Sequence, residues 1–496
     1  MATIARTIKE QLAEIAGKGN VLDSPDVMER YGTDNSVARP GLFTCVVRPR
    51  DARETQKIIR LANEARFAVV PHSSGIHFNG DAIPKVGGVV LDMERMNGIT
   101  EIDEENRVAH IEVGVTWEQL QTALEARGYR SVMPLLPHAS RSVISDWLER
   151  ELPVVQIHEY ADPMLSLHVI WGNGEEFVTG TASINTFRDP EHPECLADGV
   201  IPDGPGPINF DEFLYGAQGT IGAVSWGITK IEEIPTITKT FFIPTHKAEE
   251  AIEPLYKILR RRVGYECLLL NNLNLATILA ERWPAQFDEL RDILPPWTVI
   301  LVIGALKRRP EEKIAYQENF LRDMMLSYFP NLEPLTTLPG AMMVNKQIPE
   351  MLRKPWPADK TYWKHAYKGG CQDLTFMTTL DRVERFLVVA GEVATRCQYP
   401  YQDMGCYIQP VENGRACQLQ FNFYYDPTSE AEKNKVRRLY DDTAAAMLEK
   451  GAYFSRPYGA VADMVYRRNG DYTSILKRVK KLFDPNNIMN PGNLCF

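Results

Sequence analysis

A ten-residue loop, PHSSGIHFNG at 71–80, limits most strongly what this chain can fold into. It follows an apolar, β-branched run at 67–70 and precedes a second strand candidate at 86–92. Gly75 and Gly80 allow positive φ and a close approach of a ligand, while free N–H groups and the hydroxyls of Ser73 and Ser74 can surround a diphosphate. The same residues are also compatible with a polar turn between two strands.

The segments on either side of the loop favour the diphosphate interpretation. Residues 46–71 indicate a strand, a turn and an amphipathic helix, and residues 87–129 indicate three strands and a helix. This order resembles the FAD-binding domain, called PCMH-type, of the vanillyl-alcohol oxidase and p-cresol methylhydroxylase flavoprotein family. The resemblance implies that the loop holds the FAD pyrophosphate through Pro71, His72, Ser73, Ser74, Gly75, Ile76, His77 and Gly80.

Three regions are expected along the chain, which together predict an α+β fold. Residues 1–235 form the N-terminal part of the FAD-binding domain and close on a block that contains Gly219, Ile221 and Gly222. Residues 236–454 change to longer helical segments with short apolar strands, which indicates an inserted α+β substrate-binding cap. Residues 455–496 return to the FAD-binding domain, because their ending, DPNNIMNPG, resembles the family's terminal signature, which includes Asn490.

Composition excludes several classes of function. The 496 residues carry a net charge of −10 with no Lys/Arg block, which argues against nucleic acid or membrane partners. The first twenty residues lack the continuous apolar core of a signal peptide, and no run is long enough to span a bilayer, so we expect neither a signal peptide nor a membrane span. Its eight cysteines lack metal-ligand spacing, so we expect reduced thiols and no metal in a cytoplasmic protein. We also expect a homodimer or larger homo-oligomer.

The segment 133–180 resembles the family's flavin-contacting stretch, and its departures bear on catalysis. Flavin contacts are implied for Pro137, Ser142, Val143 and Ser145. Where the family has its catalytic Asp, this chain has Pro137, with His138 beside it. His138 is therefore our preferred base, unless it is a histidine of a surface turn. Asp146 is the alternative base, and it also fits a carboxylate at a helix start.

Phenol-oxidising members of the family bind the phenolate with two Tyr and one Arg. The corresponding positions here are Ile76, Ser455 and Arg456, so that Arg456 alone is retained as an anion-binding candidate or a structural ion pair. The histidines that tether FAD in relatives correspond to Ile76 and to Gln372–Asp373. We therefore expect non-covalent FAD, with His77 as the remaining candidate for a tether.

Three functions stay open. The first is FAD-dependent removal of a hydride from an aromatic alcohol, alkylphenol or related substrate. The second is an FAD-linked D-2-hydroxy acid dehydrogenase, which is disfavoured because the sequence lacks the HxGDGNxH run that supplies metal-binding histidines in such members. The third is a catalytically altered electron-transfer or structural subunit. The electron acceptor can be a cytochrome, a quinone, a flavoprotein or O₂, and Ser145 and Trp147 favour a dehydrogenase over an oxidase.

Overall fold

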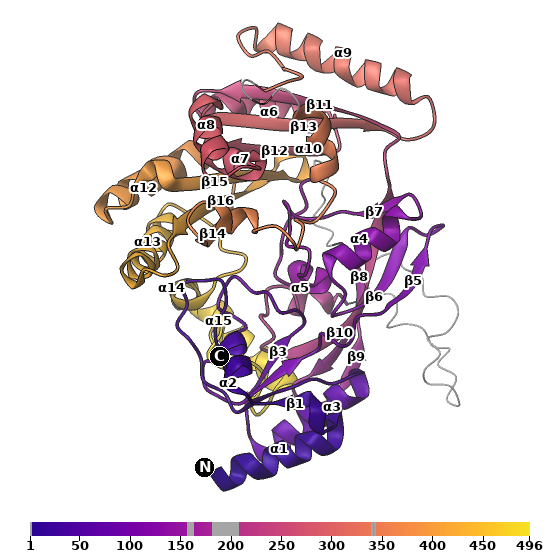
Figure 1. The fold of residues 1–496 in the computed structure, drawn as a ribbon, viewed down its shortest axis with the longest axis vertical. Coiled ribbons are helices and arrows are strands. Elements are labelled where there is room, and N and C mark those ends of the chain that lie inside the picture. Colours follow the sequence, from indigo (N-terminus) through magenta and orange to yellow (C-terminus); the bar gives the residue numbers. More distant parts are fainter. Residues whose placement is uncertain (1, 156–162, 181–207, 339–340, 342–343) are drawn as a thin grey trace.

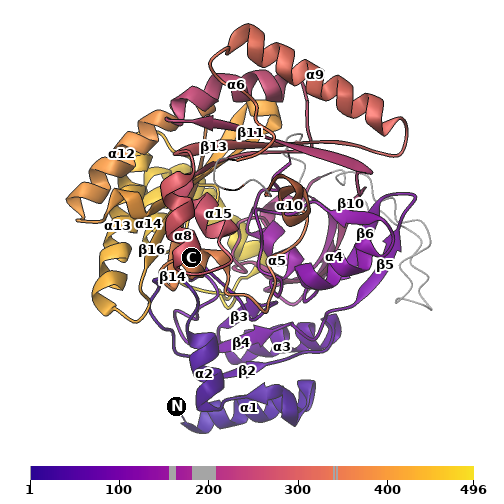
Figure 2. The same cartoon turned by 45° about the horizontal axis from the view of Figure 1, so that its top comes forward.

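The computed structural model describes residues 2–155, 163–180, 208–338, 341 and 344–496. Three β-sheets and their helices make up this part of the chain (Figures 1 and 2). Two sheets lie toward the N-terminal end of the molecule in Figure 1 and the third lies at the opposite end. The α+β class expected from the sequence is confirmed. Among the described helices, none is both long enough and apolar enough to cross a bilayer.

The first sheet holds the diphosphate loop. Its strand order is β1 (Val21–Leu22), β2 (Cys45–Val47), β4 (Val89–Asp92) and β3 (Val69–His72), and its helices are α1 (Ala2–Ala16), α2 (Pro25–Gly32) and α3 (Ala52–Ala65). β3 pairs with β4 in parallel, so that the loop leaves the carboxyl end of β3. Ligands of open parallel sheets bind at that end of the strands, which places the loop correctly for a cofactor.

The second sheet is antiparallel and is built around one long strand. Its members are β5 (Ile99–Asp103), β6 (Val108–Glu112), β10 (Gly222–Glu233), β8 (Met164–Trp171) and β9 (Glu176–Val178), with β7 (Tyr129–Ser131) also pairing with β10. Two helices, α4 (Trp117–Glu125) and α5 (Val143–Leu148), accompany it. The α5 helix begins where the Ser142 hydroxyl accepts the Ser145 N–H at 3.1 Å. Trp117 and Trp147 are buried edge to face between the two helices, with ring centroids 5.4 Å apart.

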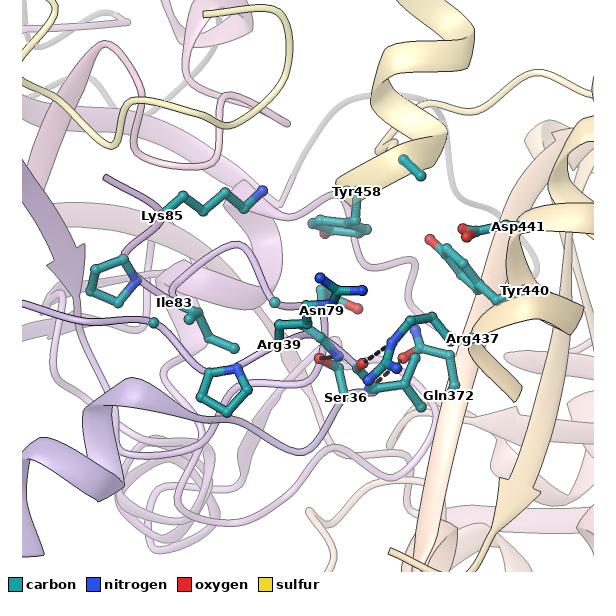
Figure 3. A pocket seen from close by; sticks show the side chains of 18 of the residues that line it. Ser36, Arg39, Asn79, Ile83, Lys85, Gln372, Arg437, Tyr440, Asp441 and Tyr458 are labelled. Carbon is teal, nitrogen blue, oxygen red and sulfur yellow. Dashed lines mark hydrogen bonds between the residues drawn. The ribbon is translucent and has the colours of Figure 1, made fainter. Parts of the chain in front are cut away.

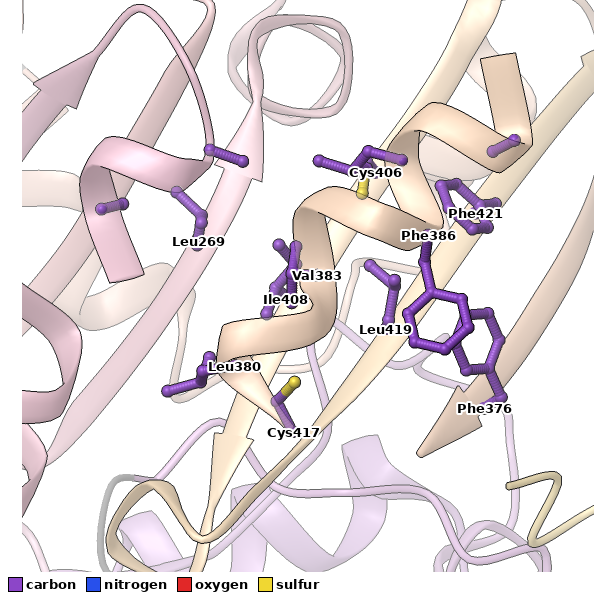
Figure 4. Close-up of a cluster of buried hydrophobic side chains, with 14 of the residues drawn as sticks. Leu269, Phe376, Leu380, Val383, Phe386, Cys406, Ile408, Cys417, Leu419 and Phe421 are labelled. Atoms are coloured by element: carbon purple, nitrogen blue, oxygen red, sulfur yellow. The ribbon is translucent and has the colours of Figure 1, made fainter. Parts of the chain in front are cut away.

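The third sheet forms the core of the region expected to be the cap. Its antiparallel order is β11 (Ile237–Thr245), β13 (Trp297–Ala305), β12 (Glu266–Asn271), β15 (Met404–Val411), β16 (Ala416–Tyr425) and β14 (Gly370–Thr378). Its helices are α6 (Glu249–Arg260), α7 (Asn272–Leu279), α8 (Ala285–Ile293), α9 (Pro310–Tyr328), α10 (Val344–Met351), α11 (Trp363–Ala366), α12 (Val383–Arg396) and α13 (Glu430–Glu449). Val383 and Phe386 of α12 pack against the strands at Leu419 and Phe421, and all four are fully buried (Figure 4). Burial of this apolar surface is what holds the helix on the sheet.

The C-terminal segment returns to the diphosphate loop after α14 (Gly459–Arg468) and α15 (Gly470–Phe483). Val69 of β3 donates its N–H to Ile488 O at 2.8 Å, and its carbonyl accepts the N–H of Asn490 at 2.8 Å. Asn490 also donates its side-chain amide to the carbonyls of Asp81 and Gln218, at 2.9 and 2.7 Å. The tail therefore lies directly beside the loop, while the division at 235 and 454 stays a prediction.

Candidate active site

The diphosphate loop is held by its own histidines. His72 Nε2 lies 2.6 Å from Ala82 O, and His77 Nε2 lies 2.7 Å from Ser74 O. A carbonyl only accepts, so each Nε2 carries the proton and each Nδ1 is left as an acceptor. Burial lowers the pKa of His72 to about 4, which keeps its ring neutral. Gly80 has φ of 75°, a conformation that disfavours a side chain there.

A cavity beside this loop contains buried polar atoms that have no partner. We call it the cofactor cavity, and it is lined by Pro71, His72, Ser73, His77, Asp81, Ser145, Glu149, Gln218, Gly219, Ile221, Gly222 and Asn490, among others. Within the described residues, His77 Nδ1, Asp81 Oδ1, Gln218 Oε1 and Asn490 Oδ1 are buried without a hydrogen bond. The hydroxyl of Ser74, in the diphosphate loop, is also buried without a hydrogen bond. Four of these atoms are acceptors and one is a hydroxyl, and native proteins rarely leave such atoms unsatisfied, so they fit a large polar ligand that brings hydroxyl and N–H donors, as FAD does.

Most of the residues expected to contact FAD are brought together here. Nine of them line the cofactor cavity: Pro71, His72, Ser73, His77, Ser145, Gly219, Ile221, Gly222 and Asn490. Gly219 has φ of 65°, and a Cβ there would lie 3.1 Å from the Pro71 ring, so a side chain would crowd the wall. Ser142 instead caps α5 and donates to Val113 O at 2.5 Å, and Val143 is buried in the core. Pro137 lines a different cavity.

That second space, the inner cavity, lies where the FAD side meets the third sheet. It is lined by Phe78, Asn79, Pro137, His138, Arg141, Asp146, Glu151, Tyr362, Trp363, Lys364, Asp373, Tyr407 and Gln420, among others. One wall is supplied by Tyr362, Trp363 and Lys364, which belong to a segment at 354–370 rich in aromatic and basic residues. The Tyr362 ring lies 5.4 Å from both the Phe78 and the His138 rings. Phe376, in contrast, is buried in the core of the third sheet.

Every cation of the inner cavity faces a carboxylate. Arg141 pairs with Asp146 and, at 2.7 Å, with Glu149, and Lys364 pairs with Asp373. Arg456, which lies outside the lining, is 2.5 Å from the lining residue Glu151 and also donates to Glu149 O at 3.2 Å. Because the charges cancel in pairs, the inner cavity offers no unpaired cation for an anionic ligand.

The hydrogen bond of His138 determines its protonation state. Its Nδ1 lies 3.1 Å from the backbone N–H of Ser140, which can only donate. The neutral ring therefore carries its proton on Nε2. Burial and the nearby Arg141 lower the pKa of His138, which favours this neutral form. In this state His138 is a hydrogen-bond donor rather than the base expected from the sequence.

Asp146 is a buried carboxylate that lines the same cavity. Trp117 Nε1 donates to its Oδ2 at 2.6 Å, and Arg141 Nε donates to its Oδ1. Burial raises the pKa of Asp146 to about 6, against the opposing effect of Arg141. A carboxylate with a pKa close to neutrality is suited to accept a proton from a substrate.

Sequence reasoning missed Glu151, Lys364 and Asp373. Glu151 has a partner that is remote in the sequence, and Lys364 and Asp373 pair between a helix and the following strand. No local spacing therefore marks these charged residues as part of a site. Glu151 and Arg456 are 305 positions apart in the chain. The available signal is indirect, since an ionisable residue in an apolar stretch needs a partner somewhere in the fold.

Two family patterns match the chain. The pattern described as "FAD binding domain" matches residues 43–143, and the one described as "FAD linked oxidases, C-terminal domain" matches residues 416–494. The first contains the diphosphate loop and the second contains Arg456 and Asn490. The chain is an FAD-dependent enzyme. The FAD cofactor and the dehydrogenase or oxidase class expected from the sequence are confirmed.

Two curated relatives that match almost the whole chain are named for other activities than those of the family that the sequence resembled. The chain is 26% identical over 521 residues to "Glycolate oxidase subunit GlcD" of Bacillus subtilis, covering 99% of this chain and 97% of that protein. It is 25% identical to the D-2-hydroxyglutarate dehydrogenase of Stutzerimonas stutzeri, covering 98% of both. The expected link to the vanillyl-alcohol oxidase family is supported only at the level of these shared FAD-enzyme regions.

Solved structures resemble the chain in fold. Substrate-bound p-cresol methylhydroxylase superposes with a TM-score of 0.82 at 15% identity, over 100% of this chain and 98% of that one. The 4-ethylphenol oxidase of Gulosibacter chungangensis gives 0.81 at 18% identity, over 99% and 97%. At such identities the likeness establishes the fold, and nothing about the substrate.

Proposed function

We propose that this FAD-dependent enzyme oxidises a small 2-hydroxy acid to the 2-oxo acid and passes the electrons to an external acceptor. The observation that carries the proposal is the end-to-end similarity to the glycolate oxidase subunit and the D-2-hydroxyglutarate dehydrogenase. This choice favours the second of the three functions left open by the sequence over the first. Bound FAD supplies the redox step, and the protein supplies binding, orientation and electrostatics.

The chain departs from hydroxy acid dehydrogenases that use metal-binding histidines. It lacks their HxGDGNxH run, and the described residues contain no group of three or more His, Cys, Asp or Glu placed to hold a metal ion. The described residues therefore do not fit a bound metal. Hydrogen-bond donors and cations of the protein must hold the substrate's oxygen atoms instead.

Two residues of the inner cavity are suited to the proton chemistry. Conversion of a 2-hydroxy acid to a 2-oxo acid removes a proton from the hydroxyl group. Asp146, with a pKa of about 6, is the acceptor that we favour. His138 would hold the same oxygen through its Nε2–H, because its Nδ1 is occupied by the Ser140 N–H. The sequence suggested His138 as the preferred base and Asp146 as the alternative, and this proposal takes the alternative.

An aromatic alcohol is the second candidate, and one observation favours it. The Tyr362 ring lies 5.4 Å from both the Phe78 and the His138 rings, and such an aromatic lining suits a flat apolar substrate. Against a phenol stand Ile76 and Ser455 in place of two tyrosines, and the pairing of Arg456 with Glu151. No cation is left free there to hold a phenolate.

Anaerobic mixing of the purified holoprotein with a substrate panel separates the candidates. The panel contains D-lactate, glycolate, D-2-hydroxyglutarate, benzyl alcohol and 4-methylphenol, and the readout is bleaching of the visible flavin band. Bleaching by a hydroxy acid, and not by its L-enantiomer where one exists, is the expected result. Bleaching by benzyl alcohol or 4-methylphenol alone would replace the proposal with the aromatic candidate.

A further inference from the structure

A third and larger cavity opens on the other side of Asn79. This outer cavity has a volume of about 800 Å³ and lies between the segments 36–42 and 79–87 on one side and β14, α13 and the start of α14 on the other (Figure 3). Its volume is within the range of small-molecule sites. Asn79 lines both the outer and the inner cavities, and its side-chain amide donates to Glu149 of the cofactor cavity at 2.7 Å. The outer cavity therefore adjoins both.

The outer cavity carries an excess of positive charge. Three cations, Arg39, Lys85 and Arg437, line it with a single carboxylate, Asp441. Arg437 donates to the neutral carbonyl of Val37 at 2.8 Å, and Lys85 donates to the neutral side-chain oxygen of Asn493. In the part of the chain that the structure describes, none of the three cations has a carboxylate oxygen within 4.0 Å. The inner cavity differs, because each of its cations is paired.

Backbone groups add to this positive potential. Gly459 and Ala460, the first residues of the ten-residue helix α14, line the outer cavity. The N-cap residue Tyr458 makes no capping hydrogen bond with its side chain. First-turn N–H groups have no acceptor within their own helix, and the helix dipole favours an anion at this end. The three cations and the N-terminus of α14 therefore all favour an anion in the outer cavity.

The side formed by the segments 36–42 and 79–87, which carries Arg39 and Lys85, is otherwise largely apolar. Pro40, Leu42, Ile83 and Val86 line it, and Leu42 and Val86 are 85% and 61% exposed at its mouth. Large apolar side chains with that exposure next to unpaired cations suit a ligand that is part carboxylate and part hydrocarbon. A fully hydrated inorganic ion would leave this wall without a partner.

We propose that the outer cavity is the site where the organic acid on which the enzyme acts first binds through its carboxylate, before its hydroxyl group reaches the inner cavity. Arg39, Lys85, Arg437 and the N-terminus of α14 hold the carboxylate, and the apolar wall contacts the hydrocarbon part. The assignment rests on the proposed function, and adds to it the residues that select an acid. Asn79 connects this site to the inner cavity, where His138 and Asp146 lie.

Ligand binding to the holoprotein tests the assignment. Pyruvate, a 2-oxo acid, is titrated while the visible flavin spectrum is followed, and pyruvamide serves as its neutral analogue. In Arg39→Gln and Arg437→Gln we expect the Kd for pyruvate to rise at least tenfold, with unchanged flavin content and unchanged Kd for pyruvamide. Arg308→Gln, an exposed arginine outside the cavity, is the matched control and should behave as the parent.

The outcomes separate this inference from the proposed function. A Kd for pyruvate that is the same in the parent and in both variants would overturn the site. Reduction of the flavin by hydroxy acids with parental kcat/KM in both variants would also overturn it, while the proposed function would stand. A third outcome is also possible, in which pyruvate binds and Arg39→Gln weakens that binding, but no hydroxy acid reduces the flavin of the parent. That result would support the site and remove the proposed function.

Discussion

Arg456 and Glu151 form an ion pair, with Nη1 and Oε1 2.5 Å apart, that joins the C-terminal segment to the loop after α5. The Arg456 side chain is 4% exposed and that of Glu151 is 26% exposed. Burial raises the pKa of Glu151, but Arg456, with Lys364 and Arg141, lowers it by more in total, so Glu151 keeps its charge in this place. The guanidinium that the sequence suggested as a holder of substrate is thus already neutralised by the protein.

Glu151→Gln should destabilise the holoprotein by about 3 kcal/mol, because it leaves the buried Arg456 without its carboxylate. Arg456→Met should cost less, since Glu151 keeps more contact with water. The double variant should lose less than the sum of the two, as expected for a coupled pair. Urea unfolding measures all four proteins. If Arg456→Met instead kept parental stability and lost substrate binding, Arg456 would be the anion-binding residue first considered.

Asp146 should give the reaction a pH dependence. Burial raises its folded pKa to about 6, and only the ionised form accepts a proton, so kcat/KM should rise as pH increases through about 6 and then level off. In Asp146→Asn this limb should vanish and the rate of flavin reduction should fall by about 10²–10⁴-fold. Flavin content of the variant, measured in parallel, separates loss of the base from loss of the fold. An unchanged pH profile would exclude Asp146 as the base.

His138 should act as a donor. His138→Gln retains a side-chain N–H and should keep part of the activity, while His138→Leu removes the donor and should lower kcat/KM by about ten- to a hundredfold, which corresponds to about 1–3 kcal/mol. Stopped-flow reduction of the flavin provides the rates. A base at this position would give a different pattern, in which Gln and Leu are equally inactive.

Ser74→Asp should abolish retention of FAD. An added carboxylate in this loop would face the cofactor diphosphate in a partly desolvated site, where an unpaired charge costs several kcal/mol. Ser74 is preferable to Gly75, because a Cβ at Gly75 would lie 2.4 Å from Arg30 Nη2 and introduce a clash. Ser74→Ala is the control and should keep the flavin. Full flavin occupancy in Ser74→Asp would place the diphosphate elsewhere.

The flavin should leave the protein on acid denaturation. Ile76 stands where some relatives have a tethering histidine, and Gln372 and Asp373 stand near another such position. Asp373 is paired with Lys364, and Gln372 accepts the Val37 N–H at 3.0 Å. Neither side chain is a nucleophile that forms a flavin bond. Fluorescence that remains with the polypeptide on a denaturing gel would contradict this, and His77 would then be the residue to replace.

Local sequence was sufficient for the cofactor side of this protein. The loop at 71–80, the glycines at 219 and 222 and the ending around Asn490 each occupy a few consecutive positions, so the pattern that shapes the backbone also carries the function. Nine of the residues predicted to contact FAD line one cavity for this reason. The α+β class could also be predicted from local sequence, because hydrophobic periodicity and turn residues are local properties.

Only the tertiary structure decided what the charged residues do. Glu151 and Arg456 are 305 positions apart in the chain and form an ion pair. Lys364 of α11 and Asp373 of β14 form another, so the charges of both pairs cancel. Residues 36–42 and 79–87 come from the N-terminal part of the chain and α13 and α14 from the C-terminal part, and the unpaired cations of the outer cavity arise where these two parts meet. The role of His138 depended on a single backbone N–H, that of Ser140. Burial and pairing set the charge and protonation of a side chain, and both depend on neighbours that sequence order does not reveal.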